Sequence, residues 1–475
     1  MLYRKEIDGL RAICILPVIF YHFDLPYFNG GYIGVDIFFV ISGYLICSLV
    51  IKDINEKRFS LKNFYERRAR RILPLLFLVI IVTTLISKIL YSPDYFESII
   101  ESSLSSTFLF SNFYFWKQSG YFEVGSELNP LFHTWSLSIE EQFYILFPIL
   151  FIFFLGFLRK KIIFLTALII ITGLVISYYA SRYHPSANFY LLPFRTFEIC
   201  FGILSALIYN FYDLKKINKH YKNYLSLFGF LFIIFSIFLF NEDTLSPGVV
   251  SLFPILGCSL VILFCEKSTF IYKFLSNKIL VLVGLISYGL YLWHIPILNF
   301  YKINFSLNST NDYLYLFFFT FLTALVTWKF IEKPFRNFKK ISSKIFLIIL
   351  ISYTIIYLIL IFYLNFNLKN KRENFVSTLN DKQKLIYKQT KIANLDNGYH
   401  QMYDDGKCKF WSRRIDENFR IRFDECFNNK KSKAIFLFGD SHQMDLYNGI
   451  ANQISNKDFI VSVSRGRCRL HTPRP

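Results

Sequence analysis

The sequence is poor in charged residues: only 18% of its 475 residues are Asp, Glu, Lys or Arg, whereas 54% are hydrophobic and 20% are aromatic. A soluble chain of this length would form two or three domains with charged surfaces. Apolar runs of about 18–22 residues instead recur as far as residue 364, and each is long enough to cross a bilayer core of about 30 Å. The composition therefore excludes a soluble protein and predicts a polytopic membrane protein.

The apolar runs predict an all-α polytopic bundle of about ten core spans followed by one linking span. The stretch 95–115 is also moderately apolar, but it contains Glu97 and Glu101, and counting it as a span would reverse every later loop. We interpret it as a re-entrant or interfacial segment. No cleavable signal peptide is visible, because the first run carries Arg11 and His22 and has no small-residue cleavage site. The predicted spans lie near 10–23, 34–51, 73–91, 135–157, 162–180, 189–209, 224–240, 249–265, 279–301, 313–331 and 345–364.

Acidic residues are scarce relative to basic ones, with 33 Asp and Glu against 53 Lys and Arg. If the N-terminus is cytoplasmic, the cytoplasmic loops hold 23 Lys and Arg and the outer loops hold three. This asymmetry follows the positive-inside rule, and it explains most of the net charge of +20 without a nucleic-acid partner. It predicts a cytoplasmic N-terminus and a C-terminal tail on the periplasmic or extracellular side.

Cysteine spacings typical of metal sites are absent, since there is no Cys-x-x-Cys motif and no matching His/Cys pattern. Five of the eight cysteines lie in apolar runs, where cysteine usually acts as a small hydrophobic residue. The other three fall in the external tail, where an oxidising compartment permits disulfides. Cys408 and Cys426 are the expected pair there, and Cys468 is left over.

Titratable side chains are costly in lipid, so each one in a span is a candidate functional residue. Arg11 and His22 lie 11 residues apart in the first span, which is about 16 Å along a helix and places them on nearly the same face. One helix then holds a cation near the cytoplasm and, toward the other side, an imidazole suited to proton transfer near neutral pH. An interfacial arginine and a histidine that caps the outer turn explain the same spacing equally well.

A second group of candidates lies in HTWSLSIEEQFY (133–144), at the expected outer edge of the fourth span. His133, Glu140 and Glu141 would meet an external substrate there, and a carboxylate beside an imidazole can orient the ring. The aromatic residues of this segment, including Trp135, are also typical of an interfacial belt, but such a belt does not explain two adjacent acids.

Further candidates are buried in other spans or gathered at the cytoplasmic side. The span 279–301 carries Tyr288 and His294, while Arg195 and Glu198 form either a functional pair or a structural salt bridge. The planar fork of arginine suits phosphate groups, although membrane anchoring is the simpler explanation for the four arginines before the third span, Arg67, Arg68, Arg70 and Arg71.

Six motifs taken together resemble the membrane acyltransferase-3 family over roughly residues 1–340, in the family's order. The resemblance implies a bacterial inner-membrane acyltransferase that moves an acyl group, expected to be acetyl, from cytoplasmic acyl-CoA to a hydroxyl of a surface polysaccharide or lipid-linked sugar such as O-antigen. Acyl-CoA is then the donor substrate, and no bound cofactor is expected. The motifs are EIDGLRA with His22, GVDIFFVISGYLI (34–46), RRARRILP (67–74), HTWSLSIEEQFY, ISYGLYLWHIP (286–296) and IEKPFR (331–336).

The resemblance also implies roles and domains. The Arg-x10-His motif of the family falls on Arg11 and His22, so we expect His22 to be the catalytic base. We expect Glu140 or Glu141 to assist at the outer face, either by orienting His22 or His133 or by binding the acceptor. Arg11 and the arginines of 67–71 would hold the phosphates of acyl-CoA. The implied parts are an acyltransferase domain (1–340), a linking helix (341–365), a periplasmic linker (366–432) and a partial SGNH-hydrolase-like domain (433–475).

The tail motif FLFGDSH (436–442) resembles the first block of an SGNH hydrolase, with a strand, a turn that presents Ser441, and a helix. A serine nucleophile needs a base and an orienting group, and no Asp-x-x-His follows Ser441. About 42 residues of such a domain are present, whereas an independently stable domain commonly needs about 100. We therefore expect an incomplete and poorly ordered external α/β segment in which Ser441 is a remnant without function.

Two other functional classes fit parts of the pattern. A proton-coupled transporter also carries Arg, His and Glu within a helix bundle, but it predicts internal repeats, and none is visible in the sequence. A non-catalytic scaffold would use the external tail to bind a partner. Acylation of a glycan in a reaction that requires acyl-CoA would distinguish an acyltransferase from both a transporter and a scaffold.

Overall fold

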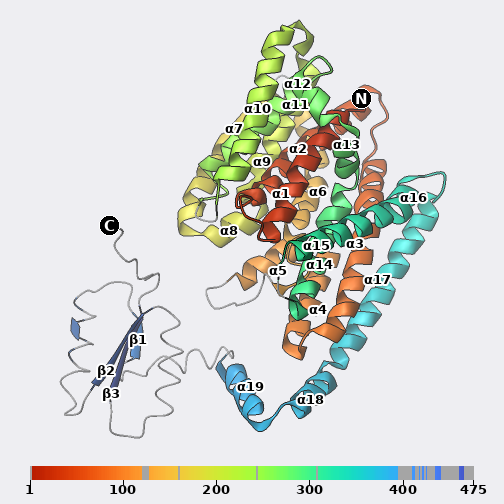
Figure 1. Ribbon diagram of the computed structural model, residues 1–475. Coiled ribbons are helices and arrows are strands. Elements are labelled where there is room, and N and C mark those ends of the chain that lie inside the picture. The colour runs from red at the N-terminus through yellow and green to blue at the C-terminus, as the bar shows by residue number, and fades with distance from the viewer. Residues whose placement is uncertain are drawn as a thin grey trace. The chain divides into compact units, whose positions relative to one another are not determined.

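The computed structural model describes residues 3–119, 128–158, 161–241, 244–305, 307, 309–393, 409–411, 417, 420, 421, 424, 434–439 and 459–464. Over these ranges most residues are helical (Figure 1). The chain divides into two compact units, Met1–Arg372 and Glu373–Pro475.

The first unit is a bundle of membrane-spanning helices, which confirms the predicted all-α polytopic class. Among the described residues, eight helices are long and apolar enough to cross a membrane, and a ninth span results if α13 (Lys278–Leu285) and α14 (Ser287–Asn304), bent by 65°, are joined. The eight are α2 (Gly34–Asn55), α3 (Leu61–Leu90), α6 (Thr134–Leu158), α7 (Ile162–Tyr183), α9 (Leu192–Phe211), α10 (Lys219–Leu239), α15 (Thr310–Thr327) and α17 (Ser343–Phe366).

The predicted spans at 10–23 and 249–265 correspond to helices that fall outside this set. The helix α1 (Lys5–His22) carries four charged residues near its start, and α11 (Leu252–Phe264) has only 13 residues. Both are nevertheless packed inside the bundle, because α1 contacts α2 and α13 while α11 contacts α10 and α9. The remaining short elements are α8 (Pro185–Tyr190), α12 (Phe270–Leu275), α16 (Lys333–Arg336) and the turns at Gly31–Ile33, Leu214–Lys216, Val249–Ser251 and Trp328–Glu332.

Small residues let α1 lie close to its neighbours. A Cβ atom added to Gly284 of α13 would collide with the backbone carbonyl oxygen of Asp8 in α1, and one added to Gly9 would collide with that of Leu275. Only glycine permits such a close approach of two backbones. This contact fixes the depth of α1, the helix that carries both Arg11 and His22.

The ambiguous stretch 95–115 forms two short helices, α4 (Pro93–Thr107, 15 residues) and α5 (Ser111–Gln118, 8 residues). At 1.5 Å per residue, neither reaches the roughly 30 Å of a bilayer core. Hydroxyl pairs tie both helices to the start of α6: Ser106 Oγ lies 2.8 Å from Thr134 Oγ1, and Ser111 Oγ lies 2.7 Å from Ser138 Oγ. The pair of short helices therefore holds the end of α6 at which His133 lies.

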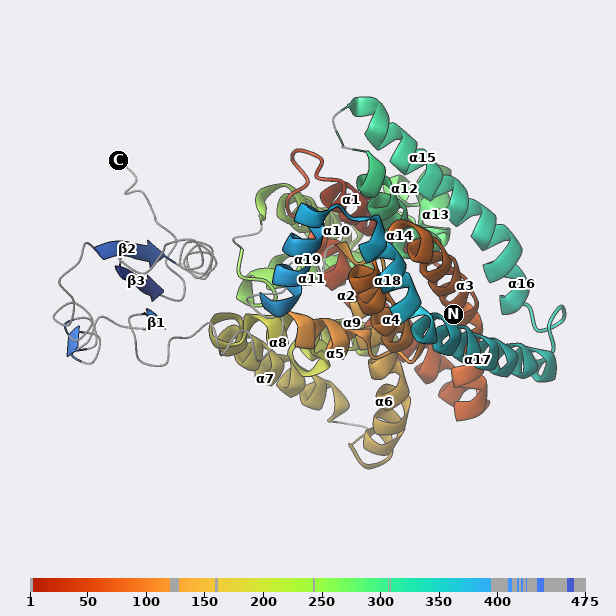
Figure 2. The ribbon, with the colours of Figure 1, turned by 90° about the horizontal axis from the view of Figure 1, so that it is seen from below.

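The linking helix α17 runs along the margin of the bundle beside α3, as the view from below shows (Figure 2). The ring of Tyr353 stacks on Phe77 with 3.9 Å between centroids. Beyond α17, Lys371 Nζ donates to the backbone oxygens of Lys88 and Tyr91 at 2.7 and 2.9 Å, and Arg372 pairs with Asp94 and Glu97 at 3.0 and 2.8 Å. These contacts anchor the first turn of α18 (Leu368–Thr378) on the corner between α3 and α4.

The second unit contains α19 (Asp381–Ala393) and a parallel sheet of three strands in the order β1-β3-β2. The strands are β1 (Lys409–Trp411), β2 (Ala434–Gly439) and β3 (Phe459–Ser464), and β2 pairs with β3 over its whole length. The strand predicted before the Gly-Asp-Ser-His turn is confirmed as β2, whereas β1 and β3 were not predicted. Ser441, the helix expected after it, Cys408, Cys426 and Cys468 lie outside the described residues.

Candidate functional site

One end of the bundle gathers arginines from three helices, and we call this group the arginine cluster: Arg11, Arg68, Arg71 and Arg336. Arg11 Nη1 lies 3.5 Å from Asp8 Oδ1, and the side chains of both residues are 12% exposed. Asp8 also accepts a hydrogen bond from the hydroxyl of Tyr3 at 2.6 Å. Burial, followed by the hydrogen bond to Asp8, raises the pKa of Tyr3 to about 12, so this hydroxyl stays a donor at neutral pH. Asp8 thus has two partners that hold it beside the cluster.

Glu140 and Glu141 lie beside this cluster rather than beside His133, while their expected assistance to a histidine or to the acceptor stays a prediction. Glu140 Oε1 accepts hydrogen bonds from the hydroxyls of Ser42 and Tyr144, and Arg68 lies 5.6 Å from the centre of the Tyr144 ring. The positive charges that act on Glu140 are those of Arg71, Arg68 and Arg11. The reason is helical rise: seven or eight residues beyond His133 correspond to about 10–12 Å along α6.

Two of the five arginines expected to bind phosphate have structural partners instead. Arg67 pairs with Asp53 at 2.5 Å. Arg70 is 1% exposed, donates to the backbone oxygens of Phe335 and Ile341 at 3.0 and 2.8 Å, and pairs with Glu66. By contrast, no ion pair within 4.0 Å joins Arg71 to any described residue. The structure therefore brings Arg11, Arg68 and Arg71 together and leaves Arg67 and Arg70 out.

A depression of about 690 Å³ opens next to the cluster, at the bend between α13 and α14. Lys333 Nζ lies 3.5 Å from the centre of the Trp328 ring within it. Arg336 belongs both to this lining and to the arginine cluster, so the depression leads toward Arg11. The sequence motif IEKPFR contains Arg336, but its spacing alone assigned no role to it. The lining residues are Leu285, Trp328, Lys333, Arg336, Asn337 and Phe338.

Tyr288, a further sequence candidate, lies near the start of α14 and donates its hydroxyl to the backbone oxygen of Ile72 in α3 at 2.8 Å. This hydrogen bond ties α14 to the helix that carries Arg68 and Arg71. Its visible role is to join two helices at the arginine end.

At the other end of α1, three histidines come together from α1, from α14 and from the residue just before α6, and we call them the histidine group: His22, His133 and His294. The ring centroid of His294 lies 5.1 Å from that of His22 and 5.2 Å from that of His133. His133 and His294 are 2% and 0% exposed. The sequence named all three as candidates, but only the fold brings them into one place. Within the part of the chain that the structure describes, no three His, Cys, Asp or Glu side chains are arranged to hold a metal ion.

Backbone carbonyls fix the tautomers of two of these rings. His22 Nδ1 lies 2.8 Å from the carbonyl oxygen of Val18, and His294 Nδ1 lies 2.5 Å from that of Tyr291. A carbonyl oxygen can only accept, so Nδ1 carries the hydrogen in both rings. In the neutral form, Nε2 of each ring then has a free lone pair. His22 is thus set up as a base at Nε2 rather than at Nδ1.

Tyr291 organises the histidine group, and sequence reasoning missed it. Its hydroxyl donates to the backbone oxygen of His133 at 2.7 Å and is 2.6 Å from Ser136 Oγ. Its ring contacts those of His133 and His294 with centroids 5.3 and 5.4 Å apart. Tyr291 lies three residues before His294 on α14, so the helical i, i+3 spacing was the one available signal.

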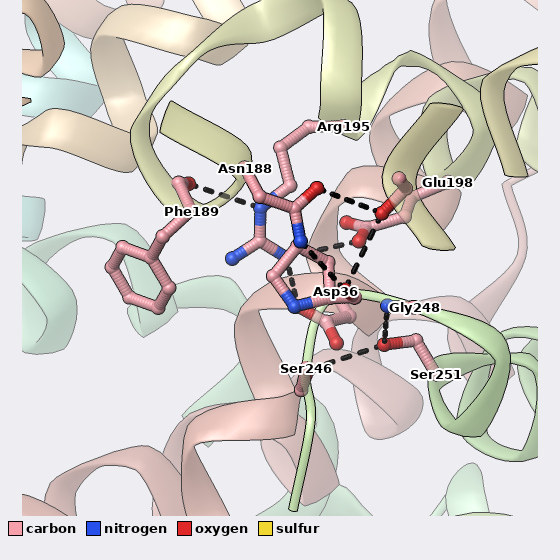
Figure 3. Close-up of polar contacts among 10 residues, drawn as sticks. Asp36, Asn188, Phe189, Arg195, Glu198, Ser246, Gly248 and Ser251 are labelled. Carbon is pink, nitrogen blue, oxygen red and sulfur yellow. Dashed lines mark hydrogen bonds and ion pairs between the residues drawn. The ribbon is translucent and has the colours of Figure 1, made fainter. Parts of the chain in front are cut away.

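A buried ionic network lies beside the start of α6 (Figure 3). Arg195 Nη1 contacts Asp36 Oδ1 and Glu198 Oε1, both at 2.9 Å, and Arg195 Nε donates to the backbone oxygen of Phe189 at 3.1 Å. The guanidinium carbon lies 5.5 Å from the centre of the Trp135 ring. The pair Arg195–Glu198 predicted from the sequence is confirmed as a salt bridge, and the third member, Asp36, comes from GVDIFFVISGYLI. This network holds Trp135 two residues from His133.

Two helices connect the arginine cluster with the histidine group. Arg11 and His22 lie on α1, about 16 Å apart along its axis. His133 immediately precedes α6, which carries Glu140 and Glu141 toward the arginines. The arrangement therefore sets a group of arginines and a group of histidines apart along the same pair of helices.

The acyltransferase-domain family model matches residues 4–332. A Staphylococcus aureus protein named "Putative O-acetyltransferase SAS0844" is 34% identical over 351 residues, which are 71% of this chain and 58% of that protein. The peptidoglycan O-acetyltransferase OatA of Listeria monocytogenes is 31% identical (70% and 56% covered), and the O-acetyltransferase OatA of Staphylococcus aureus is 32% identical (70% and 57% covered). The chain thus spans under three fifths of the length of these relatives. No solved structure matches it significantly.

Proposed function

Because the chain belongs to the acyltransferase family, which it matches over residues 4–332, we propose that it transfers an acyl group from acyl-CoA to a hydroxyl of a cell-surface glycan. The observation that supports this most is the pairing, on α1, of an arginine in an anion-binding cluster with a histidine whose Nε2 is available as a base. The acyl group is acetyl in this proposal, because three of its relatives are named O-acetyltransferases.

The donor would bind at the arginine end, which the charge asymmetry of the loops assigns to the cytoplasm of a bacterial inner membrane. Arg11, Arg68, Arg71 and Arg336 outnumber the carboxylates that pair with them directly, and such an excess of positive charge, on three partly buried arginines and the exposed Arg336, favours a bound anion. The phosphates of acyl-CoA supply that charge at the depression lined by Lys333 and Arg336. The pantetheine arm then extends along α1 toward His22. In this proposal Glu140 and Glu141 help to position Arg68 and Arg71 through their charge, without a direct ion pair.

The acceptor hydroxyl would approach from the histidine end. His22 Nε2 takes its proton as the oxygen attacks the thioester carbonyl, and the thiolate of CoA leaves. Val18 O holds Nδ1–H, so the ring keeps Nε2 toward the substrate. One relative is named a peptidoglycan O-acetyltransferase, which makes a peptidoglycan-type glycan the first acceptor to test, ahead of O-antigen.

The test uses the purified full chain in lipid nanodiscs with acetyl-CoA and soluble peptidoglycan fragments. We expect release of free CoA that depends on the acceptor, together with a glycan that gains an acetyl group by mass spectrometry. His22→Ala is expected to lower the rate about 10²–10⁴-fold, because a general base is removed. The exposed His220 provides a matched control, and His220→Ala should keep the wild-type rate.

Two outcomes would contradict the proposal. A wild-type protein that leaves acetyl-CoA unconsumed with these fragments and with O-antigen would remove its basis. Uptake of glycan into vesicles in the absence of acyl-CoA would favour a transporter instead. A full rate in His22→Ala would reject His22 as the base.

A further inference from the structure

We propose that His294 is a positioning residue that shares the proton taken up by His22, so that the base of the reaction is a pair of imidazoles rather than one. This inference rests on the proposed acyl transfer. It concerns His294, a buried titratable side chain to which the proposed acyl transfer assigns no role.

His294 occupies the middle of the histidine group. Its ring lies about equally far from His22 of α1 and His133 at the start of α6, at 5.1 and 5.2 Å between centroids. The side chain is 0% exposed, and its Nε2 has no hydrogen-bond partner among the described residues. A buried polar nitrogen without a partner costs free energy, so its retention calls for a partner that is present only at some stage of the reaction.

The hydrogen bond from His294 Nδ1 to Tyr291 O makes Nε2 the acceptor. His22 has the same arrangement, with Nδ1–H on Val18 O. In their neutral forms both rings then carry a lone pair on Nε2 and their hydrogen on Nδ1, and the ring centroids are 5.1 Å apart. When His22 Nε2 gains a proton, it becomes a donor, and Nε2 of the neighbouring His294 is a ready acceptor. A hydrogen bond with one charged partner is roughly twice as strong as a neutral one.

Within the part of the chain that the structure describes, no carboxylate forms an ion pair with His22. In the usual acid–base arrangement a buried carboxylate orients the imidazole and stabilises the imidazolium. The charges that act on His22 are those of Asp24 and Lys302, which pair with each other at 3.0 Å on the surface. Glu140 and Glu141 lie with the arginine cluster instead. The second imidazole therefore fills the place that a carboxylate takes elsewhere.

The acceptor O–H bond breaks as its oxygen bonds to the acyl carbon, and the proton goes to His22 Nε2, where it is shared with His294 Nε2. The C–S bond breaks and the sulfur leaves with the electron pair as thiolate. The shared proton then passes to that sulfur, which gives free CoA thiol, and both rings return to their neutral forms.

The experiment is the acetyl-CoA and peptidoglycan-fragment assay with His294→Ala in nanodiscs. We expect kcat to fall about 10²-fold with the KM for acetyl-CoA unchanged, because the residue acts on the proton and not on donor binding. Imidazole added to the buffer should restore part of kcat. Pyrazole, which has nearly the same size but is a far weaker base, should restore less. His184→Ala, at an exposed histidine, is the matched control.

Equal rescue by both compounds, or no rescue, would overturn the proposal, because space filling or a lasting structural defect would then explain the loss. If His294→Ala is not recovered as a monodisperse protein, His294→Gln replaces it: the amide can accept a hydrogen bond but cannot take a proton, and a wild-type kcat there would overturn the sharing. A protein that depends on His22 but runs at full rate without His294 refutes only this inference. A full rate in His22→Ala rejects His22 as the base, and a wild-type protein that leaves acetyl-CoA unconsumed refutes the proposed function.

Discussion

Replacing Arg195 by Met would leave two carboxylates without their cation inside the bundle. Asp36, Glu198 and Arg195 are 2%, 0% and 2% exposed, and the single guanidinium contacts both acids at 2.9 Å. Asp36 Oδ2 and Glu198 Oε2 have no hydrogen-bond partner among the described residues. The variant Arg195→Met thus removes the cation to which both acids are paired.

The magnitude follows from the charge balance. Removing one partner of a buried ion pair typically costs about 3–5 kcal/mol, because the remaining charge has lost both water and its partner. Glu198→Gln instead removes one of the two carboxylates, so that one guanidinium remains with one carboxylate. The amide oxygen of the new side chain can still accept a hydrogen bond from Arg195. We expect that change to cost less than about 1.5 kcal/mol, the scale of one ordinary hydrogen bond.

The assay is thermal unfolding of the purified full chain in one detergent. We expect the thermal unfolding midpoint of Glu198→Gln to lie near that of the wild type, and the midpoint of Arg195→Met to lie well below both. The triple variant Asp36→Asn, Arg195→Met, Glu198→Gln should recover part of the loss, because it contains no buried charge at this place. The reasoning fails if Glu198→Gln is as damaging as Arg195→Met, or if the triple variant is the least stable of all.

The remaining predictions concern the two ends of the bundle. Arg71→Ala should raise the KM for acetyl-CoA about 10–100-fold, which is the scale of a hydrogen bond to a charged group. Lys62→Ala, at an exposed position of the same helix, should leave the KM unchanged. Equal KM values for the two variants would speak against phosphate binding by Arg71. Arg372→Glu should speed amide hydrogen exchange in the first turn of α18, because its contacts with Asp94 and Glu97 become repulsive, while global stability changes by less than about 1 kcal/mol. Unchanged exchange there would show that Lys371 alone anchors the turn.

Much of the fold could be predicted because membrane spans are set by local composition. A run of apolar residues must form a helix in lipid wherever its neighbours lie, so the long spans followed from hydrophobicity alone. The stretch 95–115 was harder, since its glutamates and serines make it neither clearly apolar nor polar. Its division into α4 and α5 depends on hydroxyl contacts with α6, which no window of sequence contains.

The residues of the candidate site could be predicted from the sequence, but which of them lie close together in space could not. Spacing on one helix correctly suggested that Arg11 and His22 lie far apart on α1. It could not show that His294, more than 250 residues later, lies beside His22. The misplacement of Glu140 has the opposite cause: residues close together in the motif were assigned to one place, although helical rise separates them from His133. Arg67 and Arg70 looked equivalent to Arg68 and Arg71, and only their partners distinguish them.

The charges at the start of α1 have a consequence for the biogenesis of the protein. Lys5, Glu6, Asp8 and Arg11 keep this helix outside the set of apolar spans, although the folded bundle encloses it. Beyond Arg11 only Ala12–His22 of α1 are free of Asp, Glu, Lys and Arg, and these residues cover about 16 Å of a bilayer core of about 30 Å, so α1 is a weak insertion signal by itself. The helix α2 follows after a short loop, has a mean hydropathy of 2.2, and packs on α1. We therefore expect α1 to enter the lipid together with α2 as a hairpin, with Glu6 paired with Arg4 and Asp8 paired with Arg11 of the same segment.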